Sequence, residues 1–166
     1  IGVVAAGELL SMLPVSLTST AMLAGSGWML SSGVGTMKTV SRFRTYRRLL
    51  GHKTQCALER GARHVYAVDV GTGQLAAALR GDQRVSNLEQ TDIRLLSPER
   101  LPEVPDFAAC DVSFISLRLV LPSIAALLSP VGEAVVLIKP QFEAGPDRVG
   151  KKGVVRDPKV HEDVLK

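Results

Sequence analysis

Hydrophobic residues form a regular pattern from about residue 54 onward, where short apolar runs alternate with segments of helical character. Strands are predicted at 64–70, 85–88, 107–112 and 133–138, and helices at 54–60, 74–80 and 117–128. The last helix contains Pro122, which we expect to kink or weaken it. Strands that alternate with helices predict an α/β domain with a mostly parallel sheet.

The first 41 residues show no sustained helical or strand periodicity, so we expect weakly ordered chain there. The uncharged stretch from Leu9 to Met37 is 29 residues long, which is enough to cross a membrane. However, Pro14 and many Gly, Ser and Thr residues make it a poor span, and it lacks the basic start and clean apolar run of a secretory signal. A membrane partner is therefore not expected.

Composition and charge exclude several classes of protein. The chain has 166 residues and only 4% aromatic residues, which fits one domain and argues against a single-strand nucleic-acid binder built on stacking rings. The net charge of +4 comes from residues 42–53, which carry five Lys and Arg residues and no acid. Cys56 and Cys110 have no companion at metal-ligand spacing, so no metal is expected and a reducing compartment, the cytoplasm, is favoured.

A charged residue lies at or just after the end of each of the four predicted strands: Asp69, Asp92, Asp111 and Lys139. In a doubly wound sheet, ligands bind at the carboxyl ends of the strands. An acid at Asp69 is placed to accept hydrogen bonds from the ribose diol of an adenosine cofactor, and Asp92 to bind the adenine amino group. The alternative for each residue alone is a solvated strand end. The turn 71–73 lacks the third glycine of a dinucleotide fingerprint and is better explained as a tight turn.

Three strings go beyond what composition can indicate: VYAVDVGTGQL (65–75), CDVSFISLRLVLP (110–122) and LIKPQFEAGPDRVGKKGVVRDP (137–158). Together they resemble the TlyA family, often labelled hemolysin A, over about residues 54–166. The resemblance implies a Rossmann-like, FtsJ-type catalytic domain. It further implies that S-adenosylmethionine is the cofactor and that a ribose 2′-hydroxyl of ribosomal RNA, free or in a ribosomal subunit, is the methyl acceptor.

The resemblance also implies roles for individual residues. FtsJ-type enzymes use a Lys-Asp-Lys-Glu set around the target ribose, and Asp111 resembles its aspartate while Lys139 resembles its second lysine. Asp69 resembles the ligand of the cofactor ribose and Asp92 the adenine ligand, with Asp111 also beside the cofactor. A lysine whose pKa is lowered by burial can take the hydroxyl proton, but a neighbouring aspartate opposes that shift. We therefore expect Lys139 chiefly to orient the hydroxyl.

The loop from Gly145 to Lys159 contains five Lys and Arg residues against two acids. Within the family interpretation, this loop would contact RNA phosphates without sequence preference. The candidate residues are Arg148, Lys151, Lys152 and Arg156. The alternative is a solvated surface loop.

The sequence departs from the family before Thr54. The family's S4-like RNA-binding domain and its Arg-Gly-Gly…Lys segment, the source of the first catalytic lysine, are not found, and the final glutamate is expected beyond Lys166. The glycine-rich cofactor loop expected just before Thr54 is replaced by RTYRRLLGHK. The expected fold is therefore a Rossmann-like methyltransferase fold whose first strand and cofactor loop are absent or garbled.

Codon arithmetic offers an explanation for this departure. Residues 44–51 can be encoded by a set of codons that also contains a second message. When the reading frame is shifted by two bases, the same DNA encodes Asp-Val-Ser-Ala-Ser-Thr-Gly, a version of the missing loop. On this hypothesis residues 1–53 are an irregular, out-of-frame segment and 54–166 a methyltransferase domain truncated at its C-terminus. The alternative is a diverged N-terminus. Two other functional interpretations stay open: an inactive methyltransferase fragment, and a membrane-active haemolysin-type protein.

Overall fold

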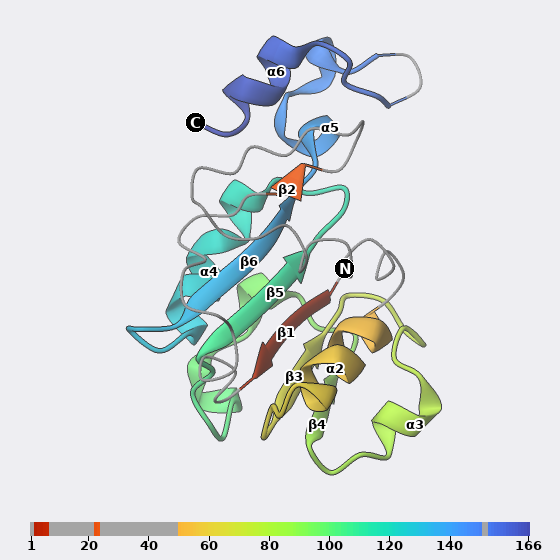
Figure 1. Ribbon diagram of the computed structural model, residues 1–166, viewed down its shortest axis with the longest axis vertical. Helices are drawn as coiled ribbons and strands as arrows, with labels where there is room; N and C mark the ends of the chain where they lie inside the picture. The colour runs from red at the N-terminus through yellow and green to blue at the C-terminus, as the bar shows by residue number, and fades with distance from the viewer. Residues whose placement is uncertain (1, 7–21, 24–49, 151–152) are drawn as a thin grey trace.

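The computed structural model describes residues 2–6, 22–23, 50–150 and 153–166 (Figure 1). The strands are β1 (Gly2–Ala6), β2 (Met22–Leu23), β3 (Val65–Val68), β4 (Val85–Leu88), β5 (Phe107–Asp111) and β6 (Glu133–Ile138). The helices are α2 (Leu50–Glu59), α3 (Ala77–Arg80), α4 (Leu121–Leu127), α5 (Pro140–Glu143) and α6 (Pro158–Asp163).

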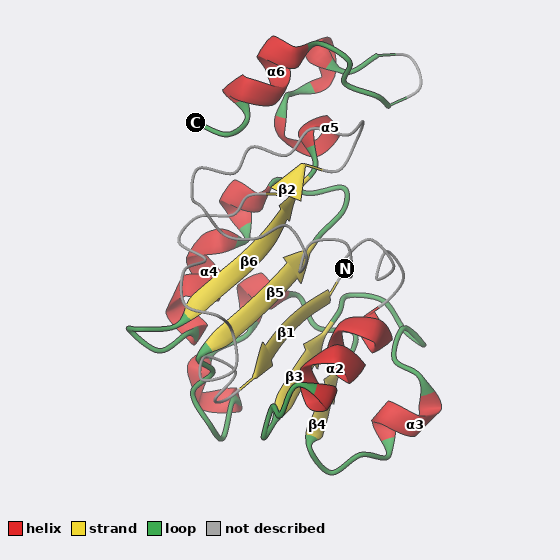
Figure 2. Cartoon of the chain, viewed as in Figure 1, coloured by secondary structure: helices red, strands yellow, loops and turns green. Residues whose placement is uncertain are grey.

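The six strands form one sheet in the order β2-β6-β5-β1-β3-β4 (Figure 2). β3 pairs with β4, β5 with β6, and β2 with β6, all in parallel. The carboxyl ends of β3, β4, β5 and β6 therefore meet at one edge of the sheet, which we call the carboxyl edge. This arrangement confirms the expected α/β class.

β1 occupies the centre of the sheet but runs antiparallel to both of its neighbours. Its residues pair with β3 from Val3 opposite Val68, and with β5 from Gly2 opposite Asp111. The start of β1, rather than its end, consequently lies at the carboxyl edge. The sequence pattern did not predict a strand here. The uncharged segment from Leu9 to Met37 lies outside the described residues, apart from β2.

Alternating side chains of the strands pack into two apolar clusters, one on each face of the sheet. Tyr66 and Val68 of β3 point into a cluster that includes Ile124 of α4. Val65 and Ala67, between them in sequence, point into the other cluster, which includes residues of α2 and the segment before α3. All four β3 residues are buried, as expected for a strand covered on both faces. The molecule is thus a sheet between two layers of helix.

Several elements differ from the sequence-based boundaries for identifiable reasons. α2 begins at Leu50, four positions before the predicted start. α3 begins only at Ala77 because the backbone amides of Gln74 and Leu75 donate to the Glu89 carboxylate. Pro122 does not kink a long helix: a 3₁₀ turn at Leu117–Leu119 precedes α4, and Pro122 lies in the first turn of α4, where its missing N–H costs nothing.

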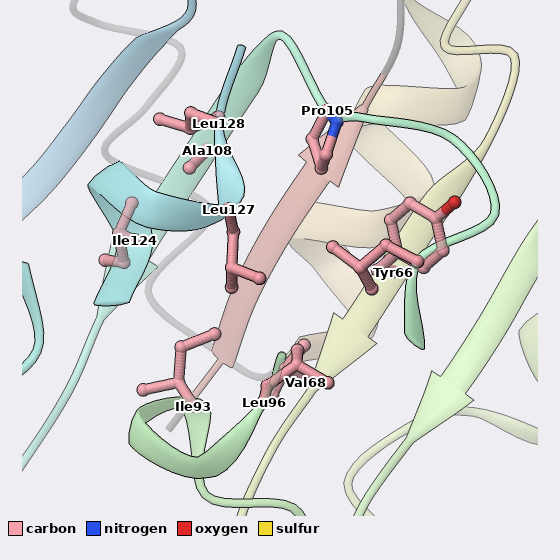
Figure 3. A pocket seen from close by; sticks show the side chains of 10 residues that line it. Tyr66, Val68, Ile93, Leu96, Pro105, Ala108, Ile124, Leu127 and Leu128 are labelled. Atoms are coloured by element: carbon pink, nitrogen blue, oxygen red, sulfur yellow. The ribbon is translucent and has the colours of Figure 1, made fainter. Parts of the chain in front are cut away.

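A small hollow lies between α4 and the sheet (Figure 3). Its volume is about 10 Å³, and its lining includes Tyr66, Ile93, Ala108 and Leu127. An apolar space of this size is at the lower limit for one water molecule and has no room for a ligand. It therefore belongs to the core. No helix in the described ranges meets the length and hydropathy needed to cross a membrane.

Ile124 provides a direct test of this core. Its side chain is 2% exposed, so Ile124→Ala is expected to lower the free energy of unfolding by about 2–5 kcal/mol. Leu121, on the same helix but 38% exposed, is the matched control, and Leu121→Ala is expected to have a much smaller effect. Urea unfolding followed by circular dichroism measures both. Equal losses would contradict the assignment of the α4 face that packs on the sheet.

Candidate active site at the carboxyl edge

An ion pair between Asp111 and Lys139 lies at the carboxyl edge. β5 and β6 are neighbouring parallel strands in which Cys110 pairs with Val136. Asp111 ends β5 and Lys139 directly follows β6, so the register brings both side chains to one place. Lys139 Nζ lies 2.6 Å from Asp111 Oδ1. Oδ1 is buried and has no well-aligned hydrogen bond, so this contact is primarily an ion pair. Asp111 and Lys139, two of the four residues predicted from the strand ends, are therefore in contact.

Lys53 approaches the same carboxylate from α2. Its Nζ lies 3.4 Å from Asp111 Oδ2, and its side chain is only 20% exposed. Because α2 begins at Leu50, Lys53 lies in the first turn of the helix, above the centre of the sheet. Sequence analysis missed this residue because it lies in the basic stretch interpreted as out-of-frame.

The segments after β5 and β6 are bound to each other by further contacts. Lys139 Nζ donates to Ser113 Oγ at 2.6 Å. Ser116 Oγ donates to one oxygen of Glu143 at 2.6 Å, and the Leu117 backbone amide donates to the other at 2.7 Å. Residues 111–117 and 139–143 therefore form one unit, which holds the side chains of Asp111 and Lys139 in place.

Phe114 is the second functional candidate that sequence analysis did not single out. It is 90% exposed, and its φ of 64° lies in the left-handed region that bulky residues rarely adopt. Its ring contacts Phe142, with 5.1 Å between the ring centroids. An exposed aromatic ring three residues after Asp111 offers a flat apolar surface beside the ion pair. The signal was available, since Phe114 lies inside the quoted string CDVSFISLRLVLP.

Asp69 follows β3 and is buried, with 4% of its surface exposed. Its Oδ1 accepts a hydrogen bond from the Gly71 amide at 2.7 Å, and its backbone carbonyl accepts one from the Thr91 amide at 2.9 Å. A Cβ at position 71 would lie 3.2 Å from Asp69 Oδ1, so glycine leaves the approach to this carboxylate open. The loop after β4 therefore lies beside the loop after β3 at the carboxyl edge.

Asp92 belongs to that loop after β4 and has a local partner. Its carboxylate accepts from the Arg94 amide at 2.9 Å and pairs with the Arg94 guanidinium at 2.6 Å. The hydrogen bonds from Arg94 hold the pKa of Asp92 below its ordinary value. Asp92 thus stays ionised at neutral pH, and its role as an adenine ligand remains a prediction.

The basic residues predicted to bind RNA fall into three situations. The Arg148 guanidinium lies 2.5 Å from the Asp163 carboxylate, so α6 holds this side chain. Arg156 is exposed. Lys151 and Lys152 lie outside the described residues. A separate groove of about 670 Å³ between α2 and α3, bordered by Gln55 and others, is not lined by any of the four residues predicted from the strand ends.

The electrostatics of Asp111 give a pH prediction. Burial alone would raise its pKa, but the close contact with the Lys139 ammonium and the charges of Lys53 and Lys139 outweigh burial and hold the pKa below its ordinary value of 3.8. The unfolded chain then binds this proton more readily than the folded chain. The stabilisation by Asp111 is therefore complete above pH 3.8 and is lost as the pH falls through the folded-state value.

Asp111→Asn should accordingly lower the free energy of unfolding at pH 7 by about 1–3 kcal/mol, because two ammonium groups lose their carboxylate. The variant should then lose less stability than the wild type between pH 5 and the acid limit. Urea unfolding across this range measures the difference, with the exposed Asp147→Asn as control. Parallel stability curves for wild type and Asp111→Asn would contradict the ion pair.

Comparisons with known proteins identify chains that are similar to this one in sequence and fold. The model of the FtsJ-like methyltransferase family matches residues 50–166. YqxC of Bacillus subtilis, provisionally named an rRNA methyltransferase, is 56% identical over 117 residues, covering 70% of this chain and 42% of its own length. The 16S/23S rRNA (cytidine-2′-O)-methyltransferase TlyA of Mycobacterium tuberculosis is 49% identical over 110 residues, covering 66% of this chain and 41% of its own length.

A solved structure from Streptococcus thermophilus, described as a hemolysin, superimposes with a TM-score of 0.68 at 48% identity. It covers 70% of this chain and 42% of the other chain. The chain thus spans about two-fifths of the length of these relatives. The resemblance carried by the three sequence strings is confirmed, and the chain belongs to the FtsJ-like methyltransferase family.

Proposed function

We propose that this chain transfers a methyl group from S-adenosylmethionine to a ribose 2′-hydroxyl of ribosomal RNA. The observation that carries the proposal is the Asp111 carboxylate at the carboxyl edge with Lys139 and Lys53 on its two oxygens. The relative from Mycobacterium tuberculosis is named an rRNA cytidine-2′-O-methyltransferase, and the one from Bacillus subtilis is named for rRNA methylation. A ribosomal substrate makes the cytoplasm the expected compartment.

The described residues fit the nucleoside end of S-adenosylmethionine. Asp69 is a buried carboxylate next to a glycine whose missing Cβ leaves it approachable, which suits a ribose diol. Asp92 lies on the adjoining loop, where it would hold the adenine amino group after exchanging part of its contact with Arg94. When bound, the cofactor supplies an electrophilic methyl group on a sulfonium.

The protein groups around Asp111 suit the acceptor hydroxyl. Methyl transfer requires the acceptor oxygen to be lined up with the methyl carbon, so orientation is the first requirement. Asp111 and Ser113 fix the Lys139 ammonium, which can then donate to the 2′-oxygen and orient it. The contacts of Glu143 with Ser116 and Leu117 hold this arrangement rigid.

Two surface features suit RNA. The exposed Phe114 ring can stack on the base of the target nucleotide, since bases turned out of RNA structure commonly stack on aromatic side chains. We propose that Arg148, Arg156, Lys151 and Lys152 contact phosphates nearby, which would add affinity without sequence preference.

Cofactor binding tests the first half of the proposal. Isothermal titration calorimetry should give saturable binding of S-adenosylmethionine, and Asp69→Asn should weaken it at least about tenfold, because a charged acceptor for two hydroxyls is lost. Asn can still accept from the Gly71 amide, so the loop should keep its shape. Asp82→Asn, a partly exposed acid outside the site, is the control. Equal affinity of Asp69→Asn and wild type would exclude Asp69 as a ligand.

RNA methylation tests the second half. With ribosomal subunits and methyl-labelled cofactor, the wild type should produce alkali-resistant 2′-O-methyl nucleotides. Phe114→Ala should weaken RNA binding by about 1–3 kcal/mol, which corresponds to roughly 5- to 150-fold, while cofactor affinity stays unchanged. Leu95→Ala, at an 81% exposed apolar position, is the matched control. Loss of cofactor affinity in Phe114→Ala would argue for a structural role instead.

A further inference from the structure

The carboxylate of Glu89, in the loop after β4, lies against the turn that follows β3. Its Oε1 accepts hydrogen bonds from the backbone amides of Gln74 at 2.5 Å and Leu75 at 2.9 Å. Its Oε2 lies 3.1 Å from the Arg80 guanidinium, and the Glu89 side chain is only 8% exposed. A carboxylate buried to this degree requires such donors, and amides bind a charged acceptor more strongly than a neutral one. Glu89 therefore joins the loop after β4 to the segment that leads into α3.

Arg80 completes this connection from α3. Its Nε donates to the Leu75 carbonyl at 3.0 Å, while the Leu75 amide donates to Glu89. Both backbone polar groups of the buried Leu75 are thus paired within one closed set of contacts. The hydrogen bond from the Leu75 amide is the main influence that holds the pKa of Glu89 below its ordinary value. Glu89 is therefore ionised at neutral pH.

The turn that Glu89 contacts also contains the predicted cofactor ligand Asp69. The Gly71 amide donates to Asp69 Oδ1 at 2.7 Å, and the Gln90 amide donates to the Gly71 carbonyl at 3.1 Å. Gln90 has a φ of 56°, in the left-handed region that residues other than glycine rarely adopt, so surrounding contacts must hold it there. Glu89 directly precedes Gln90 and supplies a side-chain anchor for this conformation.

The loop after β4 continues to Asp92, the predicted adenine ligand. The Thr91 amide donates to the Asp69 carbonyl at 2.9 Å, and the Thr91 hydroxyl donates to the Glu89 carbonyl at 3.2 Å. The main chain of Glu89 thus supports the residue next to Asp92, while its carboxylate holds the turn that contains Asp69. The two acids stand on loops that Glu89 joins to each other.

We infer that Glu89 is a positioning residue for the nucleoside end of the cofactor. This inference rests on the proposed function and deepens it. Glu89 keeps the loops of Asp69 and Asp92 in one arrangement before the cofactor arrives, so neither loop has to be ordered on binding, and a preformed site binds more tightly. Both carboxylate oxygens of Glu89 already contact protein donors, so it acts through the loops and not by touching the cofactor.

Substitutions at Glu89 test this role by cofactor binding. Glu89→Ala leaves the amides of Gln74 and Leu75 without their acceptor, and isothermal titration calorimetry should show S-adenosylmethionine binding weakened about 5- to 150-fold. Glu89→Gln can still accept from both amides and should recover most of that affinity. Glu99→Ala, at an exposed acid outside these loops, should match the wild type. Equal affinity of Glu89→Ala and wild type would overturn the inference.

Hydrogen exchange tests the same contacts without cofactor or RNA. The amides of Gln74 and Leu75 should exchange slowly in the wild type and in Glu89→Gln, and faster in Glu89→Ala. Equal exchange of these amides in all three proteins would overturn the connection between the loops. If Glu89→Ala does not fold, Glu89→Asp takes its place, because aspartate keeps the charge but is one methylene too short to reach both amides.

Kinetics separate positioning from a general effect on the fold. With ribosomal subunits as substrate, Glu89→Ala should raise KM for S-adenosylmethionine by about the factor found in calorimetry, while kcat at saturation and KM for RNA stay unchanged. A parallel loss of kcat and of RNA affinity would indicate a structural role only. If Glu89→Ala binds normally while Asp69→Asn does not, the inference fails and the proposed function stands. A wild type that binds no cofactor would overturn both.

Discussion

The half-buried carboxylate of Asp111 sets the constraint on which the carboxyl edge depends. A carboxylate at the end of a central strand, away from full hydration, needs compensating charge. The sheet provides it through the parallel pairing of β5 and β6, which brings Lys139 to one oxygen, and α2 provides it on the other through Lys53. The hydrogen bonds of Ser113, Ser116 and Glu143 then follow as the scaffold that keeps these charges together.

This constraint connects fold and chemistry. Two ammonium groups that share one carboxylate are not equivalent, because their distances and other partners differ. Lys139 is held at 2.6 Å by both Asp111 and Ser113, whereas Lys53 lies 3.4 Å from the carboxylate, so Lys139 is the more firmly positioned of the two. The neighbouring loops after β3 and β4 are hydrogen-bonded to each other, so the acids predicted to hold a nucleoside stand on the same edge as the charged cluster.

The sequence predicted those parts of the molecule in which the local pattern and the tertiary structure agree. β4 and β6 have the predicted bounds, and β6 in particular is a largely apolar run bounded by turn residues. Asp111 and Lys139 could be paired in advance because the ends of parallel strands share an edge. The start of α3 could not be predicted from the local pattern. The backbone amides of Gln74 and Leu75, where the helix was expected to begin, donate instead to the Glu89 carboxylate from the loop after β4. Lys53 was missed because it lies in the basic stretch interpreted as out-of-frame; the packing of α2 reveals its position.

The antiparallel direction of β1 has a consequence for how the chain folds. Every pairing of β1 joins the beginning of the chain to strands distant in sequence, whereas β3 and β4 or β5 and β6 are joined through short crossovers. Closing so long a loop is costly in entropy and tends to be slow. β1 should therefore enter the sheet late, between the β3–β4 pair and the β5–β6 pair. The centre of this sheet is completed last, and the two halves of the carboxyl edge come together only at that stage.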